Sequence, residues 1–291
     1  MRALADQVVI VTGASSGIGE ATVRRLSRRG AKLVINARRP EPLAVLAREL
    51  DPAGTRVRAI AGDITDAAIR QQLVDEARGN FGRIDALVNN AGYGTRGPVE
   101  LVPVDLIRRN FETNLFSLIA LTQLVIPHMR ERGAGRIVNT GSVAGRIARP
   151  LSSVYDSTKH ALEAITDGLR GELAPFGIQV VLVRPGFILT GFVDAANEAS
   201  ASVIENAGPY APYFEGFRHD YRRLRWIAGR PDDIARVVEK ALAARRPAPR
   251  YAAPGHAKFF LFLKWLLPAR AIDWAVRLRK RPNQERQHPR E

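Results

Sequence analysis

Short apolar runs alternate with longer stretches of helical periodicity through the first 190 residues of the chain. The runs are apolar throughout, which is typical of strands that helices cover on both faces. This alternation predicts an α/β fold built on one doubly wound parallel sheet. The predicted strands are Val8–Val11, Lys32–Ile35, Arg56–Ile60, Ala86–Val88, Arg136–Asn139 and Gln179–Val183, with a last edge strand opening at Arg250-Tyr251. The predicted helices are Gly17–Arg29, Glu41–Glu49, Asp66–Gly79, Pro103–Arg132, Ser153–Pro175 and Pro231–Ala244.

Each of the first six strands is followed within a few residues by a cluster of glycines or polar side chains. In an open parallel sheet, ligands bind outside the carboxyl ends of the strands. The clusters therefore predict a single binding crevice along one edge of the sheet. They are residues 12–19, 38–39, 63, 89–92, 142 and 185–186.

The first cluster is a glycine-rich loop between a strand and a helix. Glycines permit a tight turn and let backbone N–H groups approach a pyrophosphate at a helix N-terminus. The strand–loop–helix context favours a dinucleotide site over a loop with incidental glycines. The candidate cofactor residues of this loop are Gly13, Ser15, Ser16, Gly17, Ile18 and Gly19.

The glycine loop has the spacing Thr-Gly-x-x-x-Gly-x-Gly and is followed by Asn89-Asn90-Ala91-Gly92, Ser142 and Tyr155-x-x-x-Lys159. In this order the motifs resemble the classical branch of the short-chain dehydrogenase/reductase family, near its NADP(H)-dependent hydroxysteroid and retinol dehydrogenases. The resemblance runs from about residue 8 to residue 190. It implies a single Rossmann-type domain over residues 1–255 and hydride transfer between a nicotinamide cofactor and a carbonyl or secondary alcohol.

The end of the second strand indicates which nicotinamide cofactor is used. NAD sites usually carry an acidic residue there, which binds the ribose 2′-hydroxyl. This chain has Ala37 followed by Arg38, and a guanidinium can bind a 2′-phosphate bidentately. We therefore predict NADP(H), with the hydroxyls of Ser15 and Ser16 as further donors. Ser16 stands where many NADP-preferring relatives carry Lys or Arg, and Arg38 as a solvated arginine at a helix start is the alternative.

The family resemblance implies the remaining cofactor contacts. Asp63 and Ile64 would hold the adenine edge, although Asp63 as a helix N-cap is an equally simple interpretation. Asn90, with Ala91 and Gly92, would lie against the adenosine ribose. The segment after the sixth strand would face the nicotinamide through Pro185, Gly186, Ile188 and Thr190.

Tyr155 and Lys159 are four residues apart in a predicted helix, so their side chains share one face. A nearby ammonium, together with the positive nicotinamide of the oxidised cofactor, stabilises a phenolate and lowers the pKa of the phenol, which suits proton exchange with a substrate oxygen. By the resemblance, Ser142 would hydrogen-bond the substrate carbonyl, and Lys159 would also bridge the nicotinamide ribose. Asn114 would hold a water that relays protons to Lys159; as an alternative, Asn114 is simply a polar residue of a helix.

Residues 187–228 form an irregular, aromatic segment, which the resemblance identifies as the substrate lid. Its rings would suit a large apolar substrate such as a steroid, retinoid, fatty or aromatic carbonyl. Packing of the same rings onto the core is the alternative. The aromatic residues are Phe187, Phe192, Tyr210, Tyr213, Phe214, Phe217, Tyr221 and Trp226.

Residues 256–280 predict a helical C-terminal extension, and residues 281–291 a polar tail. Most of the net charge of +15 lies in the C-terminal quarter, because residues 215–291 hold 19 Lys and Arg against 8 Asp and Glu. Apolar helices flanked by basic residues favour peripheral contact with a membrane over residues 258–281. A contact with another subunit is the alternative, since the family resemblance implies a homodimer or homotetramer.

The composition narrows the class of protein. The chain has no cysteine, its five histidines lack metal-ligand spacing, and its basicity is too localised for a nucleic-acid coat. Without a secretory segment at its start, the expected location is the cytoplasm, with or without a peripheral position at the inner face of the membrane. Two other functions stay open: an epimerase or dehydratase of the same superfamily, and a non-catalytic NADP(H)-sensing or membrane-tethered binding protein.

Overall fold

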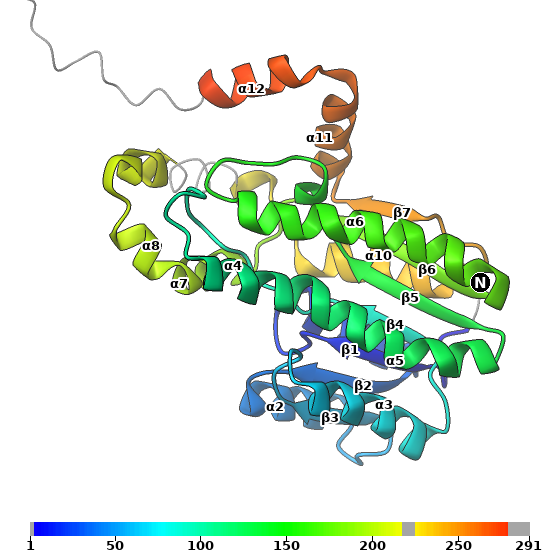
Figure 1. Cartoon of the computed structure of the whole chain (residues 1–291). Coiled ribbons are helices and arrows are strands. Elements are labelled where there is room, and N and C mark those ends of the chain that lie inside the picture. Colours follow the sequence, from blue (N-terminus) through cyan, green and yellow to red (C-terminus); the bar gives the residue numbers. More distant parts are fainter. Residues whose placement is uncertain (1–2, 217–224, 279–291) are drawn as a thin grey trace, which may run out of the picture.

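The computed structural model describes residues 3–216 and 225–278 of the chain (Figure 1). Its seven strands pair in parallel, in the order β3-β2-β1-β4-β5-β6-β7, which confirms the predicted doubly wound α/β fold. The strand order reverses beside β1, so the carboxyl ends of β1 and β4 flank a switch point where ligands bind. The strands are β1 (Val8–Thr12), β2 (Lys32–Ala37), β3 (Val57–Ala61), β4 (Ala86–Asn89), β5 (Gly135–Thr140), β6 (Ile178–Pro185) and β7 (Arg250–Ala253).

Helices cover both faces of the sheet, as the continuously apolar strands require. One apolar cluster joins the sheet to α1 (Gly17–Arg28), α2 (Pro40–Leu50) and α10 (Pro231–Ala243). The opposite face packs against α3 (Ala67–Phe81) and α5 (Ser117–Glu131), and α6 (Ser153–Leu173) lies over β6. A 3-10 turn from Ala174 to Phe176 ends this last helix at its proline.

The single helix predicted over residues 103–132 is interrupted. It consists of α4 (Val104–Phe111), a π-helical turn (Glu112–Phe116) and α5, so the prediction of one continuous helix is wrong. A π turn inserts one extra residue into a helix and often occurs at a functional site. Here it carries Asn114, whose side chain is buried.

The segment 187–228, predicted as the substrate lid, is more regular than its sequence indicates. It contains α7 (Phe192–Ala199), α8 (Ala201–Glu205), a 3-10 turn (Gly208–Tyr210) and helical residues 211–216. At its return, a second 3-10 turn spans Arg225–Ile227. Phe217 and Tyr221 lie outside the described residues.

Two helices follow β7 and project from the sheet (Figure 1). They are α11 (Gly255–Leu266) and α12 (Ala269–Leu278), in the segment predicted to be a helical extension. Among the described residues, no helix is long and apolar enough to cross a bilayer. The predicted polar tail, 281–291, lies outside the described residues.

Candidate active site

The glycine loop is shaped by contacts that leave no room for side chains. Gly13 has a φ of +66°, and a Cβ on it would lie 2.9 Å from the Cα of Ala91. A Cβ on Gly19 would collide with the carbonyl oxygen of Gly13. Helix α1 begins at Gly17, and the Ser16 side chain makes no cap bond to it. First-turn N–H groups at the edge of the sheet are the arrangement that binds a pyrophosphate, so the loop fits a dinucleotide.

Thr12 and Asn90 hold the end of β4 against this loop. The Thr12 hydroxyl accepts hydrogen bonds from the N–H groups of Asn90 and Ala91, each at 3.0 Å. The Asn90 side chain donates to the carbonyl oxygens of Thr12 and Gly13 at 3.0 and 3.1 Å. Asn90 therefore braces the glycine loop, a contact that the sequence did not indicate.

The end of β2 carries an exposed arginine. Ala37 is buried as the last residue of the strand, and Arg38 follows it in solvent. Within the described part of the chain, Arg38 forms no ion pair, so its guanidinium can bind an anion.

Asp63 lies beyond β3, where its carboxylate accepts the N–H and the hydroxyl of Thr65, both at 2.9 Å. The N-cap of α3 is instead Asp66, which accepts from the Ala68 N–H at 2.8 Å. The alternative interpretation of Asp63 as that N-cap is therefore wrong. Ile64, its neighbour, is buried.

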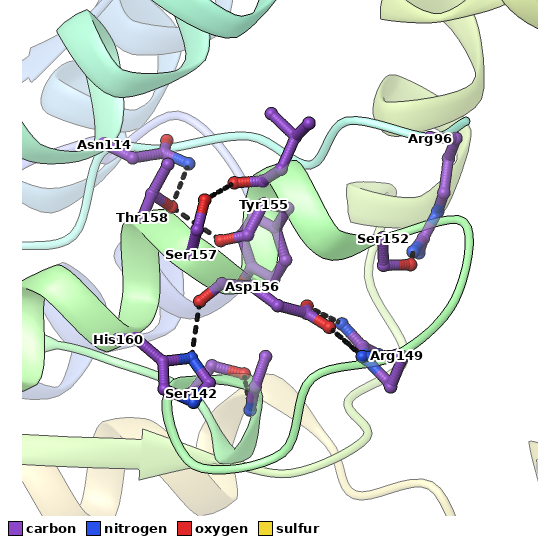
Figure 2. Close-up of polar contacts among 12 residues, drawn as sticks. Arg96, Asn114, Ser142, Arg149, Ser152, Tyr155, Asp156, Ser157, Thr158 and His160 are labelled. Carbon is purple, nitrogen blue, oxygen red and sulfur yellow. Dashed lines mark hydrogen bonds and ion pairs between the residues drawn. The ribbon is translucent and has the colours of Figure 1, made fainter. Parts of the chain in front are cut away.

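Ser142 and Tyr155, both labelled in Figure 2, lie where β5 ends against α6, and Lys159 follows one helical turn after Tyr155. The Ser142 hydroxyl lies close enough to the Tyr155 phenol to lower its pKa, and it also accepts the N–H of Ala144 at 3.0 Å. The Lys159 ammonium donates to the carbonyl oxygen of Thr140 at 2.9 Å and lies 5.9 Å from the centroid of the Tyr155 ring. Phe192 from the lid packs edge-on against the same ring, with centroids 5.3 Å apart. The three residues that the sequence grouped are thus together in space.

Asn114 is fixed by the backbone of Tyr93. Its side-chain oxygen accepts the Tyr93 N–H at 3.0 Å, and its amide nitrogen donates to the Tyr93 carbonyl at 2.9 Å and to the Thr158 hydroxyl at 3.2 Å. A Cβ on Gly92 would lie 2.9 Å from the Asn114 oxygen and 3.9 Å from the Lys159 nitrogen. Asn114 and Lys159 therefore both face Gly92, and Asn114 is a buried, bonded residue rather than a surface one.

Burial governs the ionisation of the two central groups. It raises the pKa of the Tyr155 phenol above its usual value of 10, while the Arg149 guanidinium and the Ser142 hydroxyl act in the opposite direction. Burial also lowers the pKa of Lys159 to about 8. In the protein alone, removing the phenolate from water costs more than the neighbouring cations recover. The lowered pKa predicted from the sequence includes the positive charge of the bound oxidised cofactor and stays a prediction.

The ion pair beside Tyr155 was not predicted from the sequence. Asp156 is fully buried and accepts from the Arg149 guanidinium at 2.6 and 3.2 Å, and from the Arg149 N–H at 2.7 Å (Figure 2). The pair anchors the loop between Ser142 and α6. An acidic residue directly after Tyr155, on a helix face that otherwise points inward, is the only signal that could have found it.

The segment after β6 closes the site from the other side. A Cβ on Gly17 would lie 3.1 Å from the Thr190 side chain, so this segment reaches the glycine loop. Ile188 is buried and pairs with Gly229 in an isolated parallel bridge. Pro185 is the last residue of β6 and Gly186 follows it. All six clusters predicted at the strand ends thus lie at one edge of the sheet.

The chain belongs to the short-chain dehydrogenase family, whose model matches residues 7–201. It is an oxidoreductase that acts on CH–OH or C=O groups with a nicotinamide cofactor. A 3-ketodihydrosphingosine reductase of Bacteroides thetaiotaomicron is 31% identical over 281 residues, which cover 94% of this chain and 97% of the relative.

Two solved structures share the fold over most of their length. A single-residue variant of actinorhodin polyketide ketoreductase, solved with NADPH, has a TM-score of 0.74 and 29% identity, covering 88% of this chain and 99% of that one. A 3-ketoacyl-(acyl-carrier-protein) reductase of Brucella melitensis, complexed with NADH, has a TM-score of 0.71 and 28% identity, covering 87% and 99%. Because the two hold different cofactors, the choice between NADH and NADPH depends on this chain's own residues.

Proposed function

We propose that the protein is an NADP(H)-dependent oxidoreductase that interconverts a hydrophobic ketone or aldehyde and its alcohol, with Tyr155 as the proton donor. The observation that carries this proposal is the joint position of Ser142, Tyr155 and Lys159 beside the glycine loop. When bound, the cofactor supplies or accepts the hydride at the substrate carbon.

The three polar side chains handle the substrate oxygen. Ser142 and Tyr155, which lie beside each other, both bind that oxygen and polarise the carbonyl. As the carbon gains a hydride, Tyr155 gives its proton to the oxygen, which completes the alcohol. The raised pKa of Tyr155 keeps this donor protonated at neutral pH. The Lys159 ammonium, 5.9 Å from the ring, then stabilises the phenolate that remains.

The cofactor contacts follow the edge of the sheet. The glycine loop from Gly13 to Gly19, including Ser15, Ser16 and Ile18, takes the pyrophosphate. Arg38 binds the 2′-phosphate, because it is exposed, follows the uncharged Ala37 and has no described carboxylate paired with it. Three groups hold the rest of the cofactor: Asp63 and Ile64 at the adenine, Asn90, Ala91 and Gly92 at the ribose, and Pro185, Gly186, Ile188 and Thr190 at the nicotinamide. Asn114 acts beside Lys159 in proton relay.

Only some aromatic residues of the lid are placed to contact an apolar substrate. Phe192 lies against Tyr155 and would contact a bound substrate directly. Phe214 is buried with Leu151 in a separate cluster, and Tyr210 donates to Glu100 at 2.6 Å, so these two rings hold the lid onto the body of the protein. The substrate is therefore bound by fewer aromatic walls than the sequence alone suggests.

The C-terminal helices supply a surface for a partner. Five large apolar side chains of α11 and α12 are exposed, and basic residues lie among them: Phe259, Phe262, Trp265, Leu266 and Trp274, with Lys258, Lys264 and Arg270. We infer peripheral binding to an anionic membrane surface, since lipid headgroups attract the cations while the rings enter the interface. Assembly into a homodimer or homotetramer is compatible with this contact.

Replacing Tyr155 by Phe tests the mechanism. The variant keeps the ring that packs on Phe192 but lacks the proton, so kcat for carbonyl reduction should fall by about 10²–10⁴-fold while NADPH still binds. Tyr251→Phe is the matched control, because that hydroxyl only accepts the Ala248 N–H on the edge strand. Near-normal kcat in Tyr155→Phe would refute the assignment.

A further inference from the structure

His256 lies where three segments that are distant in the sequence meet. The chain leaves β6 through Phe187 and returns at Gly229, and these two stretches are bonded to each other. The Gly229 N–H donates to the Phe187 carbonyl and the Leu189 N–H donates to the Gly229 carbonyl, both at 2.9 Å. Helix α11 begins beside this pair, with His256 as its second residue.

The His256 ring is bonded to the first of these stretches. Its Nε2 accepts the Phe187 N–H at 2.8 Å. A ring nitrogen that accepts an N–H carries no proton, so the imidazole is neutral and its proton lies on Nδ1. Burial lowers the pKa of His256, which keeps the imidazole in this neutral form at pH 7.

Gly186 and Gly229 lack side chains, so His256 and Pro254 can lie close to the backbone at these two positions. A Cβ on Gly186 would collide with the Nε2 of His256, and one on Gly229 would lie 2.7 Å from the Pro254 side chain. The α11 N-terminus is thus seated directly on the backbone at both ends of the lid.

We propose that His256 is a positioning residue for the nicotinamide half of the cofactor site. It holds the backbone of Phe187, and the next residues along the chain, Ile188 and Thr190, are those assigned above to the nicotinamide. Thr190 also approaches Gly17, so a shift of this segment changes the distance between the two halves of the site. The inference rests on the proposed function, because it concerns how that site is held.

A positioning role for His256 predicts a different pattern of ligand binding from a role in stabilising the fold alone. If His256 only stabilised the fold, its loss would weaken every ligand of the site together. If it positions the segment after β6, its loss weakens only ligands that carry a nicotinamide. The probe pair is NADPH and 2′-phospho-ADP-ribose, which keeps the adenosine and pyrophosphate but lacks the nicotinamide.

The experiment measures the dissociation constants of both probes by titration calorimetry. In His256→Leu, we expect NADPH to bind about tenfold more weakly, the effect of one lost hydrogen bond to the segment, and 2′-phospho-ADP-ribose to bind within about twofold of wild type. His256→Gln should restore most of the NADPH affinity, because its amide oxygen can accept the Phe187 N–H. His128→Leu, on α5 and remote from the segment, is the matched control and should change neither constant.

Two results would overturn the inference: equal weakening of both probes in His256→Leu, or no weakening of NADPH at all. Failure of the proposed function has a different signature, since wild-type protein would then bind neither probe, or would bind NADPH without reducing any carbonyl substrate. Should wild type prefer NADH, the same comparison applies with NADH and ADP-ribose.

Discussion

Burial of the Lys159 ammonium should lower the free energy of unfolding of the protein, and replacing Lys159 by Met tests this. The ammonium is 6% exposed, and burial lowers its pKa from 10.5 to about 8. Such a shift corresponds to about 3 kcal/mol of unfolding free energy at pH values below 8. The variant also loses the hydrogen bond to the Thr140 carbonyl, which contributes about 1 kcal/mol. Lys159→Met should therefore gain about 2 kcal/mol at pH 7 and raise Tm by about 4–8 °C, while losing activity.

The sign of the pH dependence makes this prediction specific. Between pH 8 and 10.5 the unfolded lysine binds a proton that the folded one does not, so wild-type stability rises with pH across this window. The advantage of Lys159→Met should accordingly be largest below pH 8 and shrink toward pH 10.5.

The assay monitors thermal unfolding by circular dichroism, without cofactor, at pH 7, 9 and 10.5. The quantity compared is the difference in Tm between the variant and wild type at each pH. Groups common to both proteins cancel in that difference. The exposed Lys240→Met serves as control and should show no pH-dependent difference. A Lys159→Met protein less stable than wild type at pH 7, or a constant difference across the range, would refute the reasoning.

Two further predictions concern the cofactor and the C-terminal helices. Wild type should prefer NADPH by about 10–150-fold in kcat/KM, the contribution of charge-assisted bonds, and Ala37→Asp with Arg38→Ala should narrow or reverse this ratio; a wild-type preference for NADH would contradict it. Wild type should co-sediment with anionic vesicles at low salt, and Phe262→Ser with Trp265→Ser should abolish this, whereas Val45→Ser, at another exposed apolar position on α2, should not. If the double variant sediments as wild type does, the membrane contact is wrong.

The sequence predicts those parts of the fold and site that depend on residues close to one another along the chain. Continuous apolar runs set the strands, and because a parallel sheet gathers its strand ends, the polar residues after each run had to share an edge. That reasoning placed Ser142 and the glycine loop at one edge. The helical spacing paired Tyr155 with Lys159, and the family resemblance grouped that pair with Ser142.

The features that sequence reasoning missed depend on partners far along the chain. Residues 103–132 keep helical periodicity throughout, so no local pattern indicates the π turn. Asn114 in this turn is bonded to the backbone of Tyr93, which lies 21 residues earlier in the chain. His256 contacts an amide 69 residues away, and a single histidine in a basic segment carries no local signal.

For His256 the signal was present at the other end of the contact. Gly186 does not need a positive φ, so its lack of a side chain is explained by a close neighbour rather than by a turn. Where the backbone conformation does not require a glycine, a close neighbour that occupies the position of a Cβ explains it. Here that atom is the Nε2 of His256, so the glycine and the histidine form one structural unit. A change at either residue should therefore affect the nicotinamide segment in the same way.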